Sequence, residues 1–268
     1  MQRITKFLIA YLSFIVFIVS TNPNNQVVSK NNSSSIDSIN ETINEVIENK
    51  SSSDIKVDEP IIEEISLKKM NLLILSGHAS LQKDPGAVSQ GRYEYAYAKD
   101  LTQQLSNHLK TNYPHINVIL EDAPYKAAEE ALYIGKVQPD YVISIHFNAG
   151  GGTGFEIITP LKNEKLTFAT EVVKVLRDYD IPIRPLSIYS RSTSTNRIER
   201  KVNQPLNGSD YYAVINKGAS MGIISEILEI EFIDNAQAMQ RYEQNKTKYV
   251  DAIAKSINKY YIEEYNKN

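Results

Sequence analysis

The chain has 268 residues and a formal net charge of −3, which allows one substantial domain with an appendage. This near-neutral charge gives no sign of the concentrated basic surface that a nucleic-acid-binding protein needs. Cysteine is absent, which excludes disulfides, thiolate zinc sites, a thiol nucleophile and a lipid-anchor cysteine. Any metal site must therefore be built from histidine, aspartate and glutamate.

Residues 1–20 form an apolar segment behind a short basic start. Arg3 and Lys6 precede or border the uncharged run FLIAYLSFIVFIVS. This run is shorter than the roughly 20 residues of a comfortable membrane span, which favours a signal peptide. The cleavage site is poor, because Ser20 is small but Ile18 is not, so an uncleaved membrane anchor stays open. In either case we expect the rest of the chain to be extracellular or in the cell envelope.

Residues 21–67 are rich in serine, asparagine and acidic residues and contain few aromatics. Such a composition cannot bury enough apolar surface to offset the entropy lost on ordering. We therefore predict a disordered linker over residues 21–67 and a globular domain over residues 68–268.

From residue 68 onward, short apolar runs alternate with amphipathic stretches, which predicts strands alternating with helices. The expected strands are 70–75, 116–120, 141–145, 154–159, 211–216 and 222–232. The expected helices are 93–109, 126–137, 166–176 and 235–265. Residues 181–207 fit either a strand pair or a long loop. The pattern predicts an α/β fold with a single, mainly parallel, twisted sheet flanked by helices on both faces.

Two of the four histidines lie at the carboxyl ends of predicted strands, where such sheets gather their ligands. His78 follows the first strand, and His146 ends the third in Ser-Ile-His-Phe-Asn. Glu94 opens a helix, and Glu229 lies in the last strand. Two imidazoles and a carboxylate would make a zinc site with one position left for water, and a further carboxylate could act as base.

Taken singly, these residues have ordinary explanations. His78 could be a turn histidine bonded to backbone, and His146 a hydrogen-bonded core histidine. Glu94 suits the first turn of a helix, where its charge complements the helix dipole. The metal hypothesis therefore depends on their occurring together.

A set of short motifs occurs in a characteristic order along residues 70–261. The motifs are His78 with Asp-Pro-Gly-Ala at 84–87, Gly-X-X-Glu94, Ser-Ile-His146-Phe-Asn-Ala, Gly-Phe-Glu at 154–156 and Leu-Glu229-Ile-Glu-Phe-Ile-Asp-Asn. The set resembles the zinc-dependent N-acetylmuramoyl-L-alanine amidases, so 68–268 would be the catalytic domain. The resemblance implies a peptidoglycan substrate, one Zn²⁺ per chain held by His78, Glu94 and His146, and Glu229 as the catalytic carboxylate.

Two departures from the family pattern stand out. Glu231 occupies a position where the family often has glycine, and strand alternation would put it on the same face as Glu229, with Glu226 on the other. Glu231 could then compete as base or shift the pKa of Glu229. The usual Thr-Arg after the second strand is replaced by Glu121 and Asp122, and the Arg-rich helix that often follows is absent. This second departure bears on substrate binding rather than on the metal.

Other residues carry weaker signals. Asn148 fits a backbone cap or a substrate contact, and Asp84 fits a turn. Residues 150–154 lack the Lys-Ser/Thr of a phosphate loop and predict a flexible rim. Glu156 could support the site from a neighbouring strand. A basic segment contains Arg191, Arg197, Arg200 and Lys201. It fits a solvated loop, or a contact with the carboxylates of the stem peptide or with an anionic wall polymer.

Two other functions remain open at this stage. A zinc exopeptidase acting on stem peptides would use similar ligands but would usually recruit an added aspartate or a second metal. A non-catalytic peptidoglycan-binding module would be indicated by loss of a ligand or of the base, and all four positions are intact. We therefore expect a peptidoglycan amidase, with membrane tethering only through the N-terminal segment.

Overall fold

The computed structural model describes residues 68–78, 80, 83–121, 126, 129–194 and 196–267. The predicted signal or anchor segment at 1–20 and the predicted linker at 21–67 lie outside the described residues. Within the described ranges, no helix is long and apolar enough to cross a membrane. All the described elements belong to one compact unit, residues 65–268.

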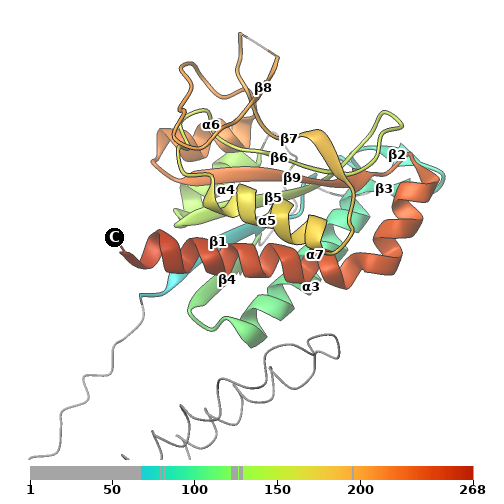
Figure 1. Cartoon of the computed structure of the whole chain (residues 1–268), viewed down its shortest axis with the longest axis horizontal. Helices are drawn as coiled ribbons and strands as arrows, with labels where there is room; N and C mark the ends of the chain where they lie inside the picture. Colours follow the sequence, from blue (N-terminus) through green and yellow to red (C-terminus); the bar gives the residue numbers. More distant parts are fainter. Residues whose placement is uncertain are drawn as a thin grey trace, which may run out of the picture. The chain divides into compact units, whose positions relative to one another are not determined.

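A seven-stranded sheet with the order β4-β1-β5-β9-β6-β7-β8 forms the centre of this unit (Figure 1). Its strands are β1 (Met70–Leu75), β4 (Ile116–Leu120), β5 (Tyr141–Asn148), β6 (Phe155–Ile158), β7 (Ile183–Arg191), β8 (Arg197–Glu199) and β9 (Ile224–Phe232). Four neighbouring pairs are parallel, whereas β6 runs antiparallel to β9 and β8 antiparallel to β7. The short strands β2 (Val88–Ser89) and β3 (Arg92–Tyr93) form a separate hairpin. The predicted mainly parallel sheet is confirmed.

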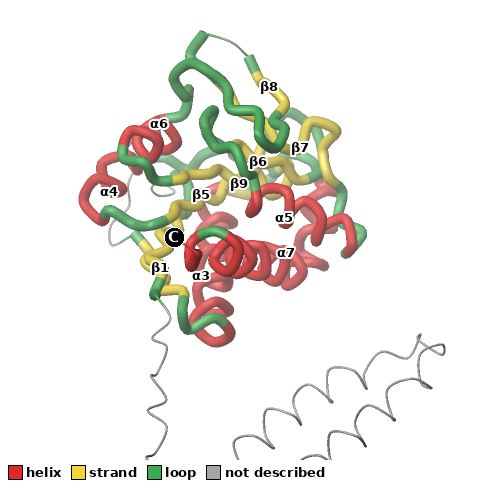
Figure 2. The backbone as a smooth tube through the Cα atoms, turned by 60° about the vertical axis from the view of Figure 1, so that its left-hand side comes forward, coloured by secondary structure: helices red, strands yellow, loops and turns green. Residues whose placement is uncertain are grey.

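Helices cover both faces of the sheet (Figure 2). One face carries α3 (Glu94–Asn112), α5 (Thr167–Asp178) and α7 (Ala236–Glu263), and the other carries α4 (Glu130–Val137) and α6 (Ala213–Ser220). Strand β1 is buried from both sides. Leu72 and Ile74 pack in the core beneath α3, α5 and α7, and Leu73 and Leu75 pack in the core beneath α4 and α6. A strand buried on both faces needs apolar side chains at every position.

The one predicted strand that is wrong covers residues 211–216, because the structure has α6 there. Val214, Ile215 and Gly218 are buried, at the spacing of one helix face. A Cβ on Gly218 would lie 2.8 Å from the Ile223 carbonyl oxygen, so the helix packs closely against the start of β9. Tertiary packing overrides the strand preference of the β-branched residues. The strand pair considered for 181–207 is confirmed as β7 and β8.

Strand β9 contains a bulge at the carboxyl end of the sheet. His146 on β5 pairs with Glu229, and Asn148 pairs with Phe232, so two steps along β5 match three along β9. A bulge of this kind reverses the alternation of side chains beyond it. Glu231 therefore does not share a face with Glu229, and the expectation that it would is wrong.

Candidate metal centre

Four elements bring the predicted site residues to one edge of the sheet. His78 lies three residues beyond β1, His146 lies within β5, and Glu229 lies opposite His146 on the neighbouring β9. Glu94 is the first residue of α3, whose start lies against this edge. Because β1, β5 and β9 are parallel, their carboxyl ends meet here, as expected for ligand sites in such folds.

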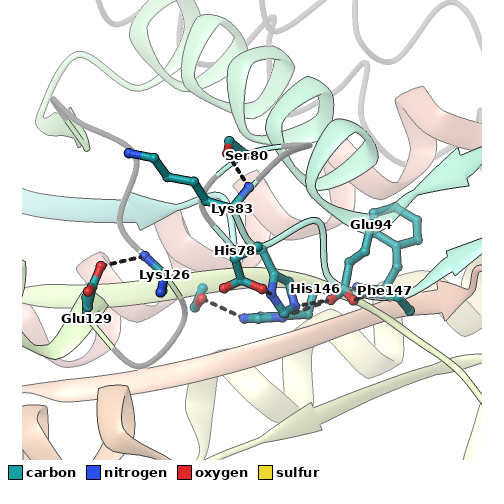
Figure 3. A network of polar contacts seen from close by, with 11 residues as sticks. His78, Ser80, Lys83, Glu94, Lys126, Glu129, His146 and Phe147 are labelled. Carbon is teal, nitrogen blue, oxygen red and sulfur yellow. Dashed lines mark hydrogen bonds and ion pairs between the residues drawn. The ribbon is translucent and has the colours of Figure 1, made fainter.

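The side chains of His78, Glu94 and His146 point toward one another (Figure 3). The Oε1 atom of Glu94 lies 3.2 Å from Nε2 of His78 and 2.9 Å from Nδ1 of His146. One donor atom from each of the three residues lies within 4.8 Å of the others. Two imidazole nitrogens and a carboxylate oxygen are the donor set that zinc favours in hydrolases. The residues present therefore fit a single divalent metal.

Two glycines allow the backbone to close around these side chains. Gly77 has φ +42°, and a Cβ there would lie 2.5 Å from the Ile145 carbonyl oxygen and 2.7 Å from Cε1 of His146. Gly86 has φ +68°, and its Cβ would lie 2.6 Å from both Glu94 Oε2 and His78 Cδ2. His78 itself has φ +69°, in the left-handed region that non-glycine residues seldom adopt. The loop after β1 is thus shaped by the site that it carries.

The outward nitrogen of each histidine has its own hydrogen-bond partner. Nδ1 of His78 lies 2.8 Å from Oδ1 of Asp84, and Nε2 of His146 lies 3.1 Å from Oγ of Ser144. Ser144 in turn donates to Oε2 of the buried Glu130 at 3.0 Å. Such outer partners fix the orientation and tautomer of metal-binding imidazoles. The backbone of Asp84 also bridges to that of Ser80.

Glu94 is held as a carboxylate by its surroundings. Its Oε1 accepts a hydrogen bond from the Phe147 backbone N–H at 3.1 Å, and its Oε2 accepts one from the Ala87 N–H at 2.8 Å. Burial alone would raise the pKa of Glu94, but the hydrogen bonds from His146 and His78 hold it well below its ordinary range. Burial likewise opposes the charged form of His146, yet the hydrogen bond to Glu94 raises the pKa of His146 to about 9.

Glu229 lies beside this group. It lines a cavity of about 340 Å³ together with His78, Glu94 and His146. Its Oε2 is buried and has no hydrogen-bond partner within the described part of the chain. Burial raises the pKa of Glu229 to about 7, against the opposing charge of His146. A carboxylate with a pKa near neutrality, aimed into a cavity, is suited to general acid–base catalysis.

Glu231 and Glu226 lie on the opposite face of β9, toward α7. Glu231 is fully buried, with Oε1 2.7 Å from Nη2 of Arg241 and Oε2 accepting from the Gly154 N–H at 2.8 Å. Glu226 accepts a hydrogen bond from the Tyr141 hydroxyl at 2.6 Å. Neither carboxylate lines the cavity, so Glu231 does not compete with Glu229 there.

Glu156 acts through Asn148 rather than through a metal ligand. Asn148 lines the cavity, and its Nδ2 donates to Oε1 of Glu156 at 2.8 Å. Glu156 is fully buried and also lies 3.2 Å from Nε of Arg184 and 3.2 Å from Nη1 of Arg197. From β6, the neighbour of β9, Glu156 therefore holds the cavity-lining side chain of Asn148 in place.

The glycine-rich loop at 150–154, predicted to be a flexible rim, forms hydrogen bonds with the residues that follow β9. Oδ2 of Asp234 accepts from the Gly150 N–H at 2.8 Å and the Gly151 N–H at 2.9 Å. Nδ2 of Asn235 donates to the Gly152 carbonyl at 2.9 Å. The residues after β9 thus hold the loop after β5.

Several cavity residues were not singled out from the sequence. Glu130 and Tyr212 line the cavity but carry no distinctive local pattern, since Glu130 resembles any acid in a helix's first turn and Tyr212 gains its position from packing. Of the basic segment, Arg200 is buried and donates to backbone carbonyls, including that of Asn163 at 2.7 Å. Lys201 is exposed. The sequence thus located the candidate metal ligands better than their surroundings.

A mainly parallel α/β sheet that carries a His-Glu-His group beside a further buried carboxylate is typical of single-metal hydrolases. Residues 72–259 match the sequence profile of the N-acetylmuramoyl-L-alanine amidase family. The chain belongs to this family.

Individual relatives agree with this assignment. The N-acetylmuramoyl-L-alanine amidase CwlM of Bacillus licheniformis is 32% identical over 90 residues, which cover 32% of this chain and 35% of that protein. The match therefore spans about a third of the curated relative.

Solved structures show the same fold. The N-acetylmuramoyl-L-alanine amidase from Clostridium difficile 630 superposes with a TM-score of 0.55 at 18% identity, covering 74% of this chain and 99% of that one. Cwp6 from Clostridium difficile also superposes with a TM-score of 0.55, at 21% identity, covering 70% of this chain and 28% of that one. The N-acetylmuramoyl-L-alanine amidase AmiC2 of Nostoc punctiforme superposes with a TM-score of 0.51 at 18% identity, covering 71% of this chain and 96% of that one.

Proposed function

We propose that the protein hydrolyses the amide bond between N-acetylmuramic acid and L-alanine in peptidoglycan, with one zinc ion per chain. The observation that carries the proposal is the His78–Glu94–His146 group with the buried Glu229 beside it, in a chain of this family. A peptidoglycan substrate implies action in the cell envelope or outside the cell. In this proposal residues 1–20 serve as signal or anchor, 21–67 as linker and 68–268 as the catalytic domain.

His78, Glu94 and His146 would hold the metal through the atoms that already face one another. Bound there, zinc supplies Lewis-acid polarisation of the scissile carbonyl and lowers the pKa of a water molecule. Asp84 and Ser144 hold the outward nitrogens of the two histidines, so the nitrogen of each ring that faces Glu94 would be left to bind the metal. The chain thereby keeps a defined ligand geometry.

Glu229 acts as the proton carrier. As a carboxylate it accepts a proton from the attacking water while the new C–O bond forms at the lactyl carbonyl. It then delivers that proton to the alanine nitrogen as the C–N bond breaks. A pKa near 7 suits both steps, because the group must gain and lose the proton at neutral pH. Asn148, anchored by Glu156, lines the space where the substrate would lie.

Digestion of purified peptidoglycan by the full chain with zinc tests this function. An amidase releases new alanine amino termini without new reducing sugar ends. Release of single amino acids from stem peptides would indicate an exopeptidase instead, and pelleting with the wall without any release would indicate a binding module. Glu229→Gln serves as the matched control, since it removes the proton carrier and leaves all three metal ligands in place.

A further inference from the structure

Three arginines on β7 and β8 lie over aromatic rings near the cavity. Each guanidinium carbon is within cation–π distance of a ring centre: 4.9 Å for Arg184 and Phe232, 3.8 Å for Arg191 and Tyr211, and 4.7 Å for Arg197 and Tyr189. Stacking of this kind restricts the orientation of the guanidinium without occupying its N–H groups. The hairpin thus presents preorganised cationic groups.

These arginines are only partly neutralised. Arg184 and Arg197 share the single carboxylate of Glu156, at 3.2 Å each. Arg191 forms no ion pair with any residue that the structure describes. Its polar neighbours are tyrosines, and a hydrogen bond with Tyr212 is the main cause that raises the pKa of Arg191. The hairpin therefore has positive charge in excess, centred on Arg191.

Arg191 lies next to the metal cavity through Tyr212. Tyr212 lines the cavity, and its ring centre is 6.0 Å from the Arg191 guanidinium carbon. The Tyr211 N–H donates to the Arg191 carbonyl at 2.9 Å, and Ser192 bridges to Asp210, so the hairpin end is joined to the segment before α6. A ligand reaching out of the cavity past Tyr212 would meet Arg191.

We propose that Arg191 binds a carboxylate of the peptide stem and so selects substrates in which that group is free rather than amidated. The inference rests on the proposed amidase function. A planar guanidinium pairs with a carboxylate through two parallel hydrogen bonds. An extended peptide advances about 3.3–3.6 Å per residue, so a carboxylate two or three residues beyond the scissile bond lies about 7–11 Å from that bond.

Two soluble muramoyl-peptides that differ only in having stem carboxylates free or as carboxamides test the proposal on the full-length, zinc-loaded protein. Arg191→Gln should raise KM about tenfold for the free-acid substrate and leave kcat within about twofold, as expected for the loss of a binding contact. For the amidated substrate, the same variant should match wild type. Arg191→Lys, which keeps the charge without the planar pair, should fall between. Arg177→Gln on α5, an exposed arginine on the opposite face, should behave as wild type.

Equal KM values of wild type for the two substrates would overturn the proposal, as would an unchanged KM of Arg191→Gln for the free acid. If the substitution instead reduces only pelleting with walls that carry an anionic polymer, the charge serves wall binding and the proposal is wrong. Failure of wild type to cut either substrate would refute the amidase function itself, which separates the two claims.

Discussion

Glu229→Gln should abolish turnover and at the same time stabilise the metal-free protein. Glu229 is buried beside the metal ligands, and its Oε2 lacks a hydrogen-bond partner within the described residues. A carboxylate in such a place is costly to ionise. Glutamine keeps the shape of the side chain but has no charge to desolvate. The folded protein should therefore gain the free energy that burial of the charged carboxylate costs in wild type.

The size of the gain follows from the pKa. Burial moves the pKa of Glu229 from an ordinary 4.5 to about 7. At about 1.4 kcal/mol per unit, that shift costs about 3 kcal/mol of folding free energy above pH 7. Because the folded-state pKa is the higher one, wild type loses this stability as pH rises from about 4.5 to about 7. The advantage of Glu229→Gln should therefore be near zero at pH 4 and largest at pH 8.

Urea unfolding of metal-free protein at pH 4, 6 and 8 measures this difference, alongside peptidoglycan hydrolysis with zinc. Glu226→Gln is the matched control, because burial also raises the pKa of Glu226 to about 7 on the other face of the same strand. It should gain stability with the same pH trend but keep its activity. An active Glu229→Gln would refute the choice of proton carrier. A variant less stable than wild type at pH 8 would refute the reasoning on burial.

Three further predictions concern the metal. His78→Ala and His146→Ala should each lower zinc occupancy from about one to below about 0.1 per chain after dialysis, measured by elemental analysis; full occupancy would exclude that residue as a ligand. Gly86→Ala should weaken zinc binding in a competition titration, because the added Cβ would lie 2.6 Å from Glu94 Oε2. Gly91→Ala is the control: Gly91 has a similar φ of +75° but nothing within 4 Å of the added Cβ, so this variant should bind zinc as wild type does. Equal zinc affinities of the two variants would contradict the packing argument. Asp84→Ala should weaken zinc binding about 10- to 100-fold by removing the partner of His78 Nδ1, and an unchanged affinity would show that the contact is only structural.

The sequence predicted most of the fold, because its signals are local. Buried parallel strands such as 70–75 are continuously apolar, and the observed β1 has those bounds. The histidines were placed at strand ends by the same pattern, which is why the three candidate ligands could be anticipated. The helix at Ala213–Ser220 was missed, because packing against β9 outweighs the strand preference of its β-branched residues.

What the sequence could not supply was register. The bulge between Glu229 and Phe232 depends on pairing with β5, and it reverses where Glu231 points. Strand alternation alone gave the wrong face. Glu130 lies far in sequence from His146, and only folding places it one serine away. The contacts that tune the site arise between elements and leave no local pattern.

The account depends on the three facing donor groups binding one metal ion. Crystals of the zinc-loaded full chain, with diffraction data collected on both sides of the zinc absorption edge, test this most directly. A single anomalous peak about 2.0–2.2 Å from His78, Glu94 and His146, with Glu229 close by but not bound, is the predicted result. A peak elsewhere, or one that includes Glu229 and leaves out a histidine, would contradict the account.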